Sequence, residues 1–129
     1  MYELTHHIVS LPTSQYIQEY RNPEKFISFC QQCERYNRCW ACPPFEFNTD
    51  EYLSGYQQTY IIGTKITFET ATRNSCTTLE RHKTISLQAI ESARKIIDPR
   101  LLTLEHEYPD SRAFYAGTCH LCPLNSCTR

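Results

Sequence analysis

Glycine is scarce in this sequence of 129 residues, which contains only Gly55, Gly63 and Gly117, and these lie far apart. No G-x-G-x-x-G or Walker-type loop can therefore be written, which excludes nucleotide binding through those loops. The chain also lacks an excess of charge of one sign, because 13 basic and 14 acidic residues give a formal net charge of -1. This balance gives no indication of binding to nucleic acid or to an anionic membrane surface.

Long apolar runs are absent as well. No segment approaches the roughly 18 consecutive apolar residues of a membrane-spanning helix. Near the N-terminus, Glu3, His6 and His7 stand where a signal peptide would need a basic start and then an unbroken apolar run. We therefore expect a cytoplasmic protein with no membrane and no nucleic-acid partner, in which thiols stay reduced.

The remaining composition is that of an ordinary globular protein, with 40% apolar and 21% charged residues. No repeat, low-complexity tract or linker divides the chain, so residues 1–129 are interpreted as a single cysteine-rich metal-binding domain. Period-2 alternation and β-branched residues predict strands over residues 1–11, 59–68 and 112–116. With a long helix between the last two strands, we expect a mixed α/β (α+β) fold, in which helices flank a short, mostly parallel sheet.

Helix-capping signals divide the rest of the chain. Asn22 before Pro23 predicts a short helix that leads into the first cysteines. Asn48 predicts a second helix, and Thr77, followed three residues later by a glutamate, predicts the long one. Apolar residues recur at helical spacing in that long helix, and we expect Pro99 to break or restart it. Residues 31–47 are expected to form an irregular loop.

Seven of the eight cysteines fall into two groups, which we call the first cysteine segment (residues 30–42) and the second cysteine segment (residues 119–127). The members are Cys30, Cys33, Cys39, Cys42, Cys119, Cys122 and Cys127. They include three C-x-x-C pairs, a spacing that lets two thiolates turn onto one ion. Three such pairs in one short chain indicate metal binding. Cys76 stands alone and is expected to be a small buried apolar residue.

The kind of metal is less strongly specified. Four thiolates suit either tetrahedral zinc or an iron–sulfur cluster. The two pairs of the first cysteine segment are closer together than the roughly 15–20 residues of a zinc ribbon, and Cys42-Pro43 resembles the ending of bacterial ferredoxin motifs. These points favour an iron–sulfur cluster of the 4Fe–4S type. A structural zinc-binding interaction domain and a thiol–disulfide redox protein remain the alternatives.

The cysteine blocks resemble those of a family of predicted metal-binding proteins catalogued as a domain of unknown function. The resemblance extends from the N-terminal strand to the last residue. It is carried by C-x-x-C-x-x-Y, W-x-C-P-P-F and A-G-x-C-x-x-C. It implies a metal centre, iron–sulfur in character, and no reaction can be transferred with it. The ligands that it implies are Cys30, Cys33, Cys42, Cys119, Cys122 and Cys127. The sequence departs from the family pattern in two ways. Cys39 stands where the family is expected to have a polar residue, and the Pro-Cys-Arg segment that follows the last block in the family is not found before Arg129. If the cysteine of that segment is a ligand in the family, Cys39 is a further candidate ligand here.

Other residues are given structural roles. Tyr36 and Trp40 are expected to pack over the metal site and exclude water. His120 lies inside a C-x-x-C pair and is expected to point away from the ion, and the other histidines, His6, His7, His82 and His106, have no ligand spacing and are expected to be surface or half-buried residues. Residues 105–107 are interpreted as a solvated helix end. No catalytic pattern names a substrate or a reaction, and nothing identifies the redox or protein partner that such a centre would serve.

Overall fold

The computed structural model describes residues 1–129 except 118, 120, 124–125 and 129. Two long strands, β1 (Tyr2–Pro12) and β2 (Gln58–Phe68), form an antiparallel pair in which every residue of one has a partner in the other. The register runs from Tyr2 opposite Phe68 to Pro12 opposite Gln58. Both strands are therefore where the alternation and the β-branched residues predict them.

Three short helices follow β1 or connect it to β2. α1 (Thr13–Tyr20) begins directly after β1, and α2 (Pro23–Gln31) begins at a cap in which the Asn22 side chain accepts from the Lys25 N–H. α3 (Thr49–Ser54) begins where the Asn48 side chain accepts from two backbone N–H groups. Both asparagine caps and the loop between α2 and α3 are confirmed, whereas α1 was not predicted from the sequence.

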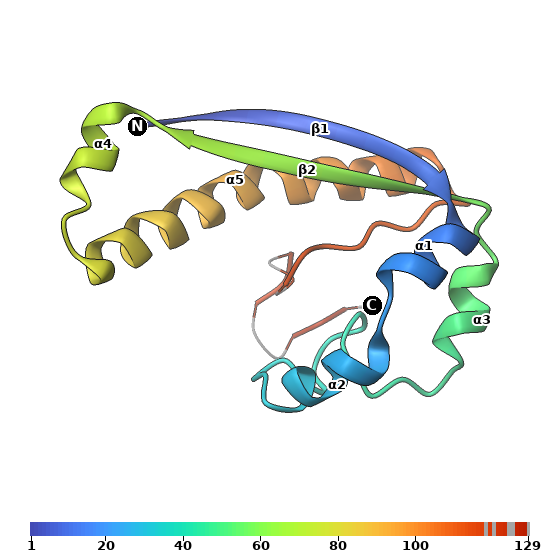
Figure 1. Ribbon diagram of the computed structural model, residues 1–129. Coiled ribbons are helices and arrows are strands. Elements are labelled where there is room, and N and C mark those ends of the chain that lie inside the picture. Colours follow the sequence, from blue (N-terminus) through green and yellow to red (C-terminus); the bar gives the residue numbers. More distant parts are fainter. Residues whose placement is uncertain (118, 120, 124–125, 129) are drawn as a thin grey trace.

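Two helices follow β2. α4 (Thr70–Ser75) is short, and α5 (Leu79–Glu107) has 29 residues and extends along the strand pair (Figure 1). The α5 cap is Thr78, whose hydroxyl accepts from the Arg81 N–H, one residue later than predicted. α5 also continues through Pro99, so the predicted break is wrong. The proline removes one backbone donor, but an ion pair between Arg94 and Asp98 crosses the turn before it, with Nη2 and Oδ2 3.0 Å apart.

The expected parallel sheet is also wrong. In the described part of the chain the sheet has two strands, and they are antiparallel. Residues 112–116 form no strand, because the end of α5 holds the start of this stretch through Glu105. The fold is mixed α+β, but the crossover that we expected between β2 and residues 112–116 does not form.

The apolar core is small. Among the described residues, the buried apolar ones are Leu11, Ala89 and Ala93, whereas Ile8 and Tyr60 of the strand pair remain 65% and 66% exposed. The accessible surface is 9958 Å². A compact protein of this mass, 15.2 kDa, would expose about 7,100 Å². The described residues therefore do not form a large, continuous apolar core. In the described residues, no helix has the length and apolar character that crossing a membrane requires.

Candidate metal centre

The first cysteine segment begins in the last turn of α2, which carries Cys30. The Cys33 N–H donates to the Cys30 carbonyl at 3.0 Å, and the Cys42 N–H donates to the Cys39 carbonyl at 3.1 Å. Each C-x-x-C pair is therefore closed by a backbone turn, as the spacing predicts. Between the pairs, Asn37 has a positive φ of 59° and its N–H donates to the Pro43 carbonyl at 2.7 Å. This bond folds the segment back on itself.

The sulfur atoms of this segment influence one another. The pKa of the Cys42 thiol is raised from its ordinary 9.0 to about 11, first by burial and then by the neighbouring thiols of Cys39, Cys33 and Cys30. A thiolate is disfavoured where it is partly removed from water and faces other thiols that can carry negative charge. Cys42 thus lies close to the other three cysteines of the first cysteine segment, and a positive ion would offset the cost of ionising it.

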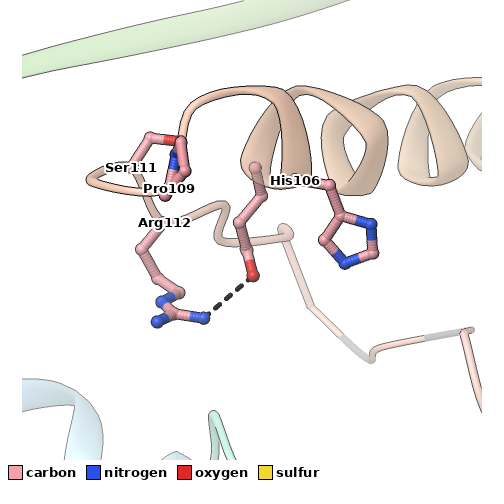
Figure 2. Close-up of a pocket in the computed structure, with 5 residues that line it drawn as sticks. His106, Pro109, Ser111 and Arg112 are labelled. Atoms are coloured by element: carbon pink, nitrogen blue, oxygen red, sulfur yellow. Dashed lines mark hydrogen bonds and ion pairs between the residues drawn. The ribbon is translucent and has the colours of Figure 1, made fainter.

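Glu105 anchors the chain that leads to the second cysteine segment. This side chain is buried, and its two oxygens accept from Arg112 Nη1 and from the Ala113 N–H, each at 2.9 Å. Figure 2 shows the ion pair with Arg112, beside a shallow surface pocket that is lined by Glu105, His106, Pro109, Ser111 and Arg112. The interpretation of residues 105–107 as a solvated helix end is therefore wrong for Glu105, because its carboxylate is a structural anchor. No cysteine lines this pocket, so it is separate from the candidate centre.

Aromatic contacts join the two parts of the site. The Trp40 ring, from the first cysteine segment, stacks on Phe114 with ring centres 6.2 Å apart, and the guanidinium of Arg112 lies 5.6 Å from the Trp40 ring centre. The Tyr52 ring of α3 also contacts Trp40, edge to face, with ring centres 6.3 Å apart. Such contacts contribute about 0.5–1.5 kcal/mol each beyond the area they bury. They hold the chain after α5 against the first cysteine segment.

Two cysteines of the second cysteine segment reach the first. The Trp40 N–H donates to Cys127 Sγ at 3.4 Å. Cys119 is near enough to Arg35, between Cys33 and Cys39, to contribute to the raised pKa of that guanidinium, after the larger effect of a hydrogen bond to Cys39. Figure 1 shows the same arrangement, with the C-terminal end beside the loop that follows α2.

The remaining cysteines are placed differently. Cys122 Sγ lies 3.7 Å from the Thr128 hydroxyl. Cys76 directly follows α4, the helix that Figure 1 shows beyond the far end of the strand pair from α2. Its thiol donates to the Thr72 carbonyl at 3.4 Å, and the residue is half-buried rather than buried. The described part of the chain contains no disulfide bond. Among the described residues, no three histidine, cysteine, aspartate or glutamate side chains are arranged so that they could hold a metal ion. The thiols are gathered but not in ligating geometry, and the ligand set stays a prediction.

The histidines take no part in this gathering where they are described. His6, His7, His82 and His106 are exposed, as expected. His120 lies outside the described residues, so its expected orientation is not tested. The sequence reasoning missed Arg35, whose Nη1 donates to Cys39 Sγ and whose backbone N–H donates to Cys33 Sγ, both at 3.5 Å. No spacing rule singles out an arginine between two C-x-x-C pairs.

Comparisons with known proteins assign the chain to a family. Neither a curated protein nor a solved structure matches the chain. Residues 16–129 match the protein family described as "Predicted metal-binding protein (DUF2284)". The match includes both cysteine segments, α5 and the Glu105 anchor. The chain therefore belongs to this family of predicted metal-binding proteins.

Proposed function

We propose that this protein holds an iron–sulfur cluster of the 4Fe–4S type through thiolates from both cysteine segments. The hydrogen bond between the Trp40 N–H and Cys127 Sγ carries the proposal, because it brings a sulfur of the second cysteine segment to the backbone of the first. Soft thiolate donors are the ligands that such clusters use. The candidate ligands are Cys30, Cys33, Cys42, Cys119, Cys122 and Cys127, of which four would be sufficient, with Cys39 as a further candidate.

The chemistry of the site fits this group. Four thiols share the first cysteine segment, and ionising Cys42 is unfavourable without a cation. The Tyr115 hydroxyl and Arg35 Nε are inaccessible to water and have no hydrogen-bond partner in the part of the chain that the structure describes. Buried donors of this kind normally meet an acceptor, and a thiolate-bound cluster would supply negatively charged sulfur atoms. When bound, the cluster would supply electron transfer, redox sensing or structural cross-linking.

Binding would have to bring the sulfur atoms closer together, because the described side chains do not stand in ligating geometry. Metal binding and ordering of the site should therefore be coupled, as they are in small metal-binding domains generally. The segments that must move are short loops tied at Trp40 and at Glu105, so the rearrangement does not require either strand or α5 to change.

Anaerobic purification followed by measurement of iron and acid-labile sulfide tests the proposal. We expect brown protein with both components, lost on Cys42→Ser and retained on Cys76→Ser, which removes a thiol outside the two segments. Stoichiometric zinc without sulfide would support the structural zinc domain instead. Protein that carries no metal and contains a rapidly alkylated thiol would support the thiol–disulfide alternative. Either result would overturn the iron–sulfur proposal.

A further inference from the structure

Arg35 contacts two candidate sulfur atoms of the first cysteine segment, one through its side chain and one through its backbone. Its Nη1 donates to Cys39 Sγ and its backbone N–H to Cys33 Sγ, both at 3.5 Å. Arg94 and Arg112, by contrast, have carboxylate partners on α5. A guanidinium that donates to a sulfur atom, as Arg35 does to Cys39, is placed to respond to the charge of that sulfur.

One nitrogen of the Arg35 guanidinium donates no hydrogen bond to the described residues. Arg35 Nε is inaccessible to water and has no hydrogen-bond partner among the described residues. Leaving a buried donor unpaired costs about 1–3 kcal/mol, more where the group is charged. Since native proteins rarely accept that cost, an acceptor is expected beside Nε when the site is complete.

A second donor without a partner comes from the chain after α5. The Tyr115 hydroxyl is also inaccessible to water and lacks a partner in the described part of the chain. Its pKa is raised first by burial and then by the neighbouring Cys119 thiol, the same residue that contributes to the raised pKa of Arg35. Tyr115 and Arg35 therefore come from two distant segments and are both close to Cys119.

We propose that Arg35 is a positioning residue of the metal–thiolate centre, which donates to sulfur atoms of both cysteine segments and offsets their negative charge, with the Tyr115 hydroxyl as a second donor. This inference rests on the proposed function, because the acceptors that it invokes are metal-bound sulfurs. Hydrogen bonds from outside the ligand set orient the ligands and tune the metal, and removing such a partner costs roughly 10–100-fold in metal affinity.

The test compares Arg35→Gln with Arg81→Gln, which removes the same charge from α5 at a residue bonded to the Ser75 carbonyl. Metal affinity is measured by competition with a chelator, and the reduction potential by equilibrium titration. We expect Arg35→Gln to lower metal affinity about tenfold and to make the potential more negative, because the reduced centre gains negative charge that the guanidinium no longer offsets. Arg35→Lys should recover part of both changes, since it retains the charge, and Tyr115→Phe should cause a smaller loss.

Each result has one meaning. Equal affinity and equal potential in Arg35→Gln and Arg81→Gln, with metal bound in both, would overturn the inference and leave the proposed function intact. Wild-type protein without any metal would overturn the proposed function, and this inference with it. If Arg35→Gln does not fold, as judged by circular dichroism, Arg35→Lys and Tyr115→Phe decide the question, and wild-type values in both would again overturn the inference.

Discussion

Replacement of Glu105 by glutamine tests how the chain after α5 is held in place. The carboxylate is buried, with only 4% of its side chain exposed, and it accepts from Arg112 and from the Ala113 N–H at 2.9 Å each. Glutamine has the same shape but a single acceptor oxygen. Its NH₂ group must therefore face one of the two donors, so one hydrogen bond is lost and a charge is removed from the other.

The expected loss of stability follows from these contacts. A hydrogen bond to a charged group contributes about 1.5–3 kcal/mol, and the donor left behind is partly desolvated. Arg112 keeps 34% of its side chain exposed and can turn toward water, which reduces the cost. We expect Glu105→Gln to lower the free energy of unfolding by about 2–3 kcal/mol. The exposed ion pair between Glu69 and the N-terminal amine supplies the control, since Glu69→Gln should cost no more than about 1 kcal/mol.

Urea unfolding followed by circular dichroism measures both variants, and the fluorescence of Trp40 reports the second consequence. Because Glu105 fixes the stretch that carries Phe114, its loss should also weaken the stacking on Trp40 and change the emission of that ring in folded protein. A Glu105→Gln variant as stable as Glu69→Gln, with wild-type emission, would refute the role of Glu105 as an anchor.

Four further predictions concern other parts of the molecule. Pro99→Ala should raise the free energy of unfolding by about 1–3 kcal/mol, because it restores a backbone donor at an exposed position inside α5; an unchanged urea midpoint would contradict this. In metal-free folded protein, Cys42 should be alkylated at pH 8 at least tenfold more slowly than in urea, since burial raises its pKa to about 11 from 9.0, and peptide mapping by mass spectrometry measures the rates. The raised pKa of Cys42 favours the protonated thiol in the folded state. The contribution of Cys42 to the free energy of unfolding is therefore fully present below pH 9 and is lost as the pH rises through about 11. Phe114→Ala should cost about 1 kcal/mol of stability through the lost stacking on Trp40, and equal unfolding curves would refute that contribution.

The local elements of this fold could be predicted from the sequence because their signals are local. The alternation over β1 and the asparagine caps of α2 and α3 act on neighbouring residues, and all are found. The pairing of strands is different, because β-branched residues indicate a strand without naming its partner. The prediction of a parallel sheet was wrong for that reason. The predicted strand over residues 112–116 was wrong because the Glu105 carboxylate binds this stretch, and no sequence signal marks Glu105 for that role.

The candidate centre shows the same division. The turns of the two C-x-x-C pairs in the first cysteine segment follow from their spacing. Cys127 lies beside that segment, where its Sγ accepts from the Trp40 N–H. The roles of Arg35 and Tyr115 could not be predicted, because they depend on which polar atoms remain without partners after folding. The choice of ligands and of metal stays a prediction.

The described residues bury only three apolar side chains, and this small core suggests what an inorganic cross-link would do for the molecule as a whole. An ion shared between Cys42 and Cys119 would close a loop containing both β2 and α5, and so restrict the freedom of the unfolded chain much as a long-range disulfide does. Resistance to proteases would then follow the supply of metal, and the lifetime of the protein would report whether its centre had been assembled.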